Sequence, residues 1–177
     1  MKKVIIKIMA FALALSMLTV VMSGCGGQSM KVKVGVKLGD DYVKFRYAQN
    51  ADDPDFIITQ EERNFLNDYE VEISYNEGDK VSALQALIEA SQGRLNIATD
   101  EEGNSLVGVA DKFRGFTYDP SKDAHVEGYD STITFFWECK INGSALTEGR
   151  AGNNYVKDGD VITFTLTSAG ASSDLVH

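Results

Sequence analysis

The amino-acid sequence predicts an α+β fold, a single domain in which one helix packs across one face of a mixed β-sheet. The segments Thr132–Ile141 and Val161–Leu166 alternate apolar and polar side chains with the period of strands that have one face on a core. The segment Val81–Ser91 instead places its apolar side chains at helical spacing. A helix between predicted strands indicates a right-handed connection across one face of the sheet.

Residues 1–24 are predicted to be a signal peptide. A positively charged start is followed by an apolar run over residues 8–22 that is short for a membrane span. The sequence Met-Ser-Gly-Cys ending at Cys25 resembles the lipobox of bacterial lipoproteins. That resemblance implies cleavage before Cys25 and a lipid on its sulfur, and an ordinary secretory signal or an uncleaved anchor is the alternative. We therefore expect an extracytoplasmic protein held on the bacterial membrane by a lipid.

The expected layout after the signal is a lipidated cysteine and tether over residues 25–30, one domain over residues 31–167, and a flexible tail over residues 168–177. The 177-residue chain has 17 basic and 26 acidic side chains, a formal net charge of −9. This charge disfavours nucleic acid as a partner, because nucleic acid attracts basic surfaces. Cys139 lies on the apolar side of its predicted strand and is expected to be a buried thiol.

The chain is expected to begin with a strand over Lys31–Leu38, where valine or leucine occupies every second position. Gly39 and two aspartates then resemble a turn, and the alternation of Val43, Phe45 and Tyr47 continues as the second strand of a hairpin.

The segment Ala48–Asp68 is the least regular part of the domain. Thr59 and Glu62 have the spacing of a capping box that opens a short helical turn. The segment is also rich in carboxylates, which either form a solvated acidic loop or collect a calcium ion. It has no EF-hand spacing.

The segment Tyr69–Tyr75 is the next predicted strand, and it should pair with the N-terminal strand. Asp79 is the predicted cap of the following helix, which Gly93 ends. The predicted core side of this helix consists of Val81, Leu84, Leu87, Ile88 and Ser91.

A short edge strand is expected next, at Leu95–Thr99. Ser105–Ala110 is another apolar run, in which Gly108 marks a bulge or a close backbone approach. Thr117–Asp130 is predicted to be a turn-rich loop. The strands Thr132–Ile141 and Val161–Leu166 should pair, and the chain loses its periodicity from Thr167 onward.

A family resemblance appears in the last third of the chain. Its motifs are W-x-x-x-I-N-G from Trp137 to Gly143, then Gly149, Tyr155 and V-x-D-G-D-x-I from Val156 to Ile162. They resemble the small β-grasp domain at the C-terminus of transcobalamin and intrinsic factor, which occurs in bacterial surface proteins under a domain-of-unknown-function label. The resemblance implies a β-grasp (ubiquitin-like) sheet. It also implies a corrinoid as a ligand, which that family holds between this domain and a larger helical barrel.

Signatures of catalysis are scarce in this sequence. It has no nucleophile-elbow, zinc-protease, phosphate-loop or dinucleotide motif. Its two histidines, His125 and His177, cannot form a multi-histidine zinc site within one chain. We therefore expect a protein that is not an enzyme, with no catalytic residue, no metal and no cofactor.

The candidate binding residues are Phe136, Trp137, Asn142 and Tyr155, which lie on or beside the predicted C-terminal hairpin. Trp137 is alternatively a core residue, and Phe136 is either exposed for a ligand or covered by the Ala48–Asp68 segment. Two alternative functions are expected. In the first, the domain captures a small ligand such as a corrinoid for uptake. In the second, it is an adhesion or scaffold module that contacts a surface protein.

Overall fold

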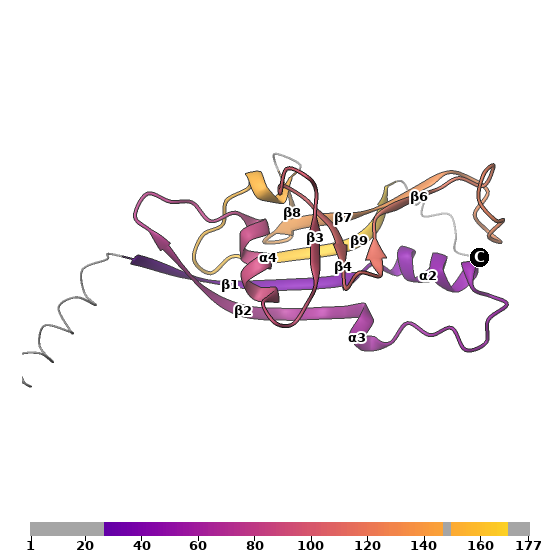
Figure 1. The fold of residues 1–177 in the computed structure, drawn as a ribbon, viewed down its shortest axis with the longest axis horizontal. Coiled ribbons are helices and arrows are strands. Elements are labelled where there is room, and N and C mark those ends of the chain that lie inside the picture. Colours follow the sequence, from indigo (N-terminus) through magenta and orange to yellow (C-terminus); the bar gives the residue numbers. More distant parts are fainter. Residues whose placement is uncertain (1–26, 147–149, 170–177) are drawn as a thin grey trace, which may run out of the picture. The chain divides into compact units, whose positions relative to one another are not determined.

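The computed structural model describes residues 27–146 and 150–169 (Figure 1). The predicted signal peptide, Cys25 and most of the predicted tail lie outside these residues. Close contacts divide the described residues into two compact units, and residues 74–79 belong with residues 27–29. The other unit comprises Met30–Ile73 and the described residues from Lys80 onward, and it contains most of β1 and β2 and all the other helices and strands.

The main sheet has six strands and is mixed. Its strand order is β2-β1-β9-β7-β6, and β8 pairs with β7. β1 and β9 are parallel, whereas β9 pairs antiparallel with β7 and β7 pairs antiparallel with β6. The strands are β1 (Gly27–Leu38), β2 (Asn64–Asn76), β6 (Phe116–Tyr118), β7 (Ile133–Ile141), β8 (Ser144–Ala145) and β9 (Val161–Ala169). The predicted α+β class and both predicted strand pairings are confirmed.

A second, three-stranded antiparallel sheet contains β3 (Ile97–Thr99), β4 (Leu106–Val109) and β5 (Phe113–Arg114). The edge strand expected at Leu95–Thr99 is confirmed as β3, and the apolar run Ser105–Ala110 contains β4. A Cβ atom added to Gly108 would lie 2.9 Å from Cγ of Arg114, so the glycine accommodates a side chain of β5.

The main sheet buries one face and exposes the other. Its inward side chains include Val34 of β1, Phe135 of β7 and Phe164 of β9, all buried. The opposite side, called here the open face, consists of Lys33 and Lys37 of β1, Thr163, Thr165 and Thr167 of β9, and Thr134, Phe136, Glu138 and Lys140 of β7. Alternation with period two produces this division, since successive side chains of a strand point to opposite faces.

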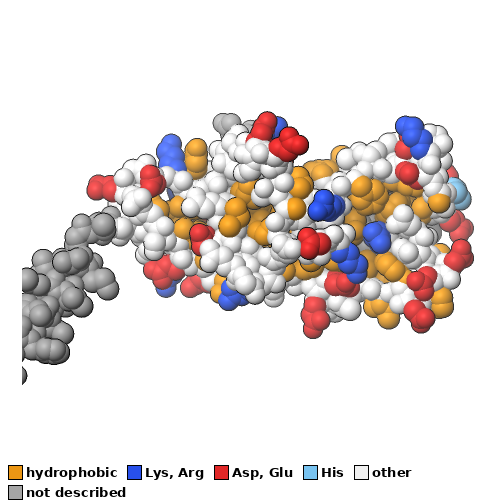
Figure 2. Space-filling view, viewed as in Figure 1, with side chains coloured by type: hydrophobic (Ala, Val, Ile, Leu, Met, Phe, Trp, Pro, Cys, Tyr) orange, Lys and Arg blue, Asp and Glu red, His pale blue; other side chains and the backbone are white. Residues whose placement is uncertain are grey.

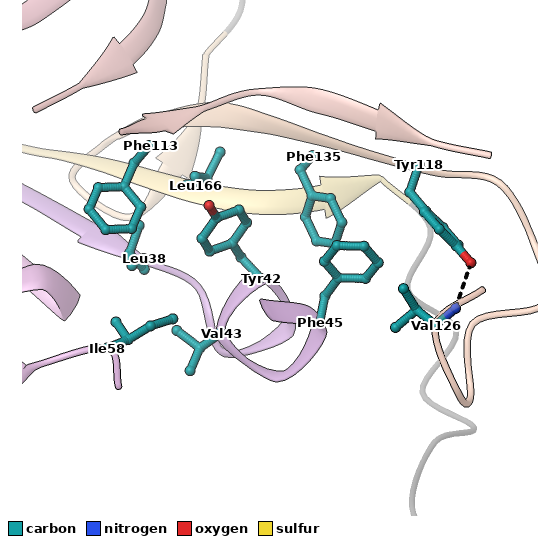
Figure 3. Close-up of a cluster of buried hydrophobic side chains, with 10 residues drawn as sticks. All are labelled: Leu38, Tyr42, Val43, Phe45, Ile58, Phe113, Tyr118, Val126, Phe135 and Leu166. Carbon is teal, nitrogen blue, oxygen red and sulfur yellow. Dashed lines mark hydrogen bonds between the residues drawn. The ribbon is translucent and has the colours of Figure 1, made fainter. Parts of the chain in front are cut away.

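The predicted hairpin over residues 40–47 is wrong, because this segment is the helix α2 (Asp40–Gln49). Its buried residues are Tyr42, Val43 and Phe45, whereas Tyr47 is 38% exposed. The buried residues therefore lie on one side of a helix and do not alternate as in a strand. The rings of Tyr42 and Phe45 lie 5.5 and 5.0 Å from the ring of Phe135 (Figure 3). Packing against distant β7 therefore decides the structure of this segment.

The helix predicted after Tyr69–Tyr75 is confirmed as α4 (Ala83–Ser91), but its predicted cap is wrong. The N-cap is Ser82, whose Oγ accepts a hydrogen bond from the backbone nitrogen of Gln85 at 3.1 Å. Asp79 instead belongs to a turn with Asn76, whose side-chain nitrogen lies 3.0 Å from an Asp79 carboxylate oxygen.

The predicted core side of α4 is wrong at Ile88, which is 43% exposed. Leu84 and Leu87 are buried as expected, together with Ala83, Ala86 and Ala90. The alanines extend the buried side around the helix, away from Ile88, because their small side chains allow close approach. Arg94, just beyond the helix, stacks 4.2 Å from the ring centre of Tyr69 on the inward side of β2.

The predicted capping box is present at the helix α3 (Gln60–Arg63). The Thr59 hydroxyl accepts from the Glu62 nitrogen at 3.2 Å, and the Glu62 carboxylate accepts from the Thr59 nitrogen at 2.9 Å. The same carboxylate bonds Lys112 at 2.6 Å, and this hydrogen bond holds the pKa of Glu62 below its usual value.

The tail predicted over residues 168–177 is wrong at Ser168 and Ala169, because β9 continues to Ala169 and pairs Thr167 with Phe136 of β7. Asp41, in the first turn of α2, holds this end of the strand. Its carboxylate accepts hydrogen bonds from the Thr167 hydroxyl at 3.1 Å and from the Ser168 nitrogen at 2.5 Å. A short 3₁₀ helix, η1 (Ala151–Asn153), precedes β9.

Within the described residues, no helix has the length and apolar composition needed to span a bilayer.

We expect Leu87→Ala to lower the free energy of unfolding by about 2–5 kcal/mol, because it leaves a cavity beneath α4. The neighbouring change Ile88→Ala should cost within about 0.5 kcal/mol, since the Ile88 side chain is exposed. Urea denaturation of both variants measures the difference. Equal losses would contradict the assigned orientation of α4.

Candidate functional site

Phe136 is the large apolar side chain on the open face, and it is 39% exposed. It pairs with Thr167 of β9. On the β6 side, Gly115 brings no side chain next to it, and a Cβ atom there would lie 3.4 Å from Cα of Phe136. The Ala48–Asp68 segment packs through Ile58 and Phe56 on the core cluster at the inward side. Of the two alternatives for Phe136, the structure shows an exposed ring.

The surroundings of Phe136 are polar. Thr165 of β9 pairs with Glu138 of β7 on one side and with Lys37 of β1 on the other. Glu138 forms an ion pair with Lys140 at 2.9 Å. The exposed ring therefore lies within a surface of hydroxyl groups and charged side chains.

The inward side beneath Phe136 is a cluster of aromatic and aliphatic side chains (Figure 3). Phe135 lies at its centre, with ring contacts to Tyr42, Phe45 and Phe116 at 5.5, 5.0 and 5.1 Å. The hydroxyl of Tyr118 accepts a hydrogen bond from the backbone nitrogen of Val126 at 3.0 Å, which ties the loop after β6 to this cluster. Burial raises the pKa of Tyr42. Phe136 therefore lies on a strand whose opposite side packs on this core cluster through Phe135.

Trp137 points to the inward side and is half-buried against the core cluster. Its indole nitrogen donates a hydrogen bond to the backbone oxygen of Phe113 at 3.3 Å. Trp137 and Phe136 therefore lie on opposite faces of β7.

Asn142 lies in the turn between β7 and β8, where its φ of 51° and the 78° of Gly143 match the turn signal in the sequence. The Asn142 side-chain nitrogen donates to Asp160 at 2.8 Å, and its oxygen accepts from the Val161 nitrogen at 2.9 Å. Both ends of this amide are engaged in joining the turn to β9.

Tyr155 is 54% exposed and lies beside the start of α4, where it forms an isolated bridge with Ser82. The ammonium of Lys80 lies 5.0 Å from its ring centre. Because α4 lies on the inward side of the sheet, Tyr155 and Phe136 do not form one site. The four sequence-predicted residues are thus distributed over two faces and a turn.

The acidic Asp52–Asp55 segment lies exposed between α2 and α3. An Asp53 carboxylate oxygen accepts a hydrogen bond from the Asp55 nitrogen at 3.0 Å, as in a local turn. Among the described residues, no group of three or more histidine, cysteine or acidic side chains is arranged to hold a metal ion. On the face shown in Figure 2, acidic and basic side chains are interspersed.

Sequence reasoning missed two features of possible contact surfaces. The sequence pattern predicts the threonines of β9 only as the polar half of a strand. It does not predict the position of β2 at the end of the strand order. The polar half of each alternating pattern is the signal for the first feature. The position of β2 depends on the order of the strands in the sheet, for which the alternating pattern contains no signal.

Cys139 is buried, and burial together with the nearby Glu138 carboxylate raises the pKa of its thiol to about 12. Near pH 8 only about one thiol in 10⁴ would be ionised, so alkylation of the folded protein should be very slow. We expect a Cys25→Ala variant to react with iodoacetamide only after denaturation. Thr134→Cys, on the exposed side of the same strand, is the control for reagent access when Cys139 is also replaced by alanine. Rapid labelling of native Cys139 would contradict its buried position.

No family model matches this chain. No curated protein matches it either. Among solved structures, the chain is similar to a protein from Ruminococcus gnavus described as a "putative metal binding protein", with 17% sequence identity and a TM-score of 0.35. The match covers 80% of this chain and 99% of that chain. At this identity and TM-score the likeness carries no argument about fold or ligand, and the β-grasp topology and the transcobalamin-like resemblance stay predictions.

Proposed function

We propose that this chain is a non-catalytic binding module, anchored on the outer face of a bacterial cytoplasmic membrane by a lipid on Cys25. Its open face contacts another protein at the cell surface. The observation that carries the proposal is the exposed ring of Phe136 in an otherwise polar surface.

The chemistry of this surface supports a protein partner. Aromatic side chains contribute strongly to interfaces because they bury a large area at a low cost in conformational entropy. Thr165 and Lys37 on the open face supply hydrogen-bonding groups, as the polar rim of an interface requires. The packed cluster behind Phe135 holds the strand rigid, which reduces the entropy lost on binding.

The dispersal of the candidate residues favours a surface contact over a small-ligand site. A small-molecule site gathers apolar side chains and a few polar groups around one concavity. Here Phe136, Trp137 and Tyr155 lie in different places, and the Asn142 amide is engaged within the fold. Capture of a corrinoid, the second candidate, rests on the transcobalamin-like resemblance.

Two features support the non-catalytic part of the proposal. The sequence contains none of the common catalytic motifs. The thiol of Cys139, which lies on β7 between Glu138 and Lys140, is buried and has a raised pKa.

The contact is tested with a photo-reactive amino acid in place of Phe136, in the full chain expressed in its own cells. We expect irradiation to produce a discrete higher-mass protein adduct from this position. The matched control places the same amino acid at Glu101, which is exposed in the turn between β3 and β4. Equal adducts from both positions, or none from position 136, would overturn the proposal.

A thermal denaturation series separates the two candidate functions. A ligand present at 100 times its dissociation constant adds about 2.7 kcal/mol to the free energy of unfolding. We expect cyanocobalamin to produce no such increase. A saturable increase would favour corrinoid capture instead.

Anchoring is tested by replacing each cysteine in turn. We expect Cys25→Ala to move the protein from the membrane fraction to the medium or to block processing, because the diacylglyceryl group supplies the hold on the bilayer. Cys139→Ala should leave the protein in the membrane fraction, since that thiol lies in the core. Mass spectrometry should identify a lipidated Cys25 at the mature amino terminus, and a different terminus would refute the lipid anchor.

A further inference from the structure

A second surface is formed by the outer edge of β2. This strand lies at one end of the strand order of the main sheet, next to β1. Its other edge therefore faces away from the sheet. An edge strand offers backbone amide and carbonyl groups to an incoming strand.

The usable part of this edge is the stretch Tyr69–Ile73. Asp68, just before it, has a φ of 46°, which interrupts the extended backbone. Ile73 is the last residue of β2 within its compact unit. The stretch is roughly 17 Å long, enough for a short peptide to pair along it.

The two sides of this stretch differ in chemistry. Tyr69 and Val71 are half-buried on the inward side, where the guanidinium of Arg94 covers one face of the Tyr69 ring. Glu70 and Glu72 are exposed on the opposite side, and Asp68 beside them is exposed as well. An incoming strand would therefore meet apolar groups on one side and carboxylates on the other.

We propose that the outer edge of Tyr69–Ile73 binds an extended protein segment in which apolar residues alternate with lysine or arginine. Backbone hydrogen bonds to β2 hold the segment. Its apolar side chains cover Tyr69 and Val71, and its basic side chains face Glu70. Opposite charges on directly paired strands stabilise the pairing, whereas like charges weaken it.

The same charges disfavour a second copy of this chain as the occupant. Antiparallel pairing of two β2 strands about Val71 would place Glu70 of each copy opposite Glu72 of the other. The formal net charge of −9 adds a further repulsion between copies. The charge pattern therefore selects a basic partner.

This surface goes beyond the proposed contact at Phe136. The strands β1 and β9 lie between β2 and β7, so the two surfaces are separated by roughly 14 Å across the sheet. A failure of either proposal leaves the other testable.

The test uses the full chain in detergent and a seven-residue peptide that alternates lysine and valine, capped at both ends. We expect the peptide to protect backbone amides within Tyr69–Ile73 from hydrogen exchange. A peptide of the same composition with all its lysines in one block should bind at least tenfold more weakly, because it cannot present one basic and one apolar side. A glutamate–valine peptide should not bind.

Matched variants locate the interaction. Glu70→Lys should weaken binding of the lysine–valine peptide about five- to tenfold and allow the glutamate–valine peptide to bind. Glu127→Lys makes the same change of charge in the exposed loop after β6 and should leave the affinity within about twofold. Phe136→Ser should also leave it unchanged.

Four results would overturn the proposal. They are equal binding of the block peptide, protection confined to other strands, an affinity that Glu70→Lys does not change, and self-association. Sedimentation measures the last of these. A dimer of the free chain that depends on β2 would identify a second copy as the occupant.

Discussion

The structure depends on covering one face of the main sheet. β9 runs between β1 and β7, and its inward residues Ile162, Phe164 and Leu166 are almost completely buried. The layer above them is discontinuous in sequence, because α2, α4 and the three-stranded sheet each supply a part. Burial of these side chains contributes about 1.5–3 kcal/mol for each large residue, so this layer is the main source of stability. The carboxylate of Asp41 in α2 accepts hydrogen bonds from Thr167 and Ser168, which joins the start of this layer to the end of β9.

The parts of the fold that the sequence predicted are those with a local cause. β9 alternates over most of its length and β7 does so except at Phe136, and the capping box at α3 needs only Thr59 and Glu62. The helix α2 was missed because Val43, Phe45 and Tyr47 fit a strand as well as a helix over so short a run. Contacts of Tyr42 and Phe45 with Phe135, some ninety residues later in the chain, decide between the two.

The candidate site was predictable to a smaller extent. Phe136 is conspicuous in the sequence because it is apolar at a position where its strand should be polar, and the structure exposes it. The separation of Trp137 and Tyr155 from that ring depends on which faces of the sheet are covered. The edge at β2 depends on strand order, which alternation does not encode. The alternation along one strand identifies which of its side chains are exposed. Which exposed side chains share a surface depends on how strands that are distant in sequence pair.

The division of the sheet into two faces also separates stability from binding. Position 115 has no room for a side chain, because a Cβ atom there would lie 2.8 Å from the carbonyl oxygen of Phe135. Replacing Gly115 would therefore disturb the core. Phe136 and Glu70 point away from the core, and single exposed apolar residues are common in folded proteins. Their replacement therefore removes a contact surface while the packing beneath stays intact. A loss of binding in such variants is then attributable to the surface itself, since the free energy of unfolding depends on the opposite side of the same strands.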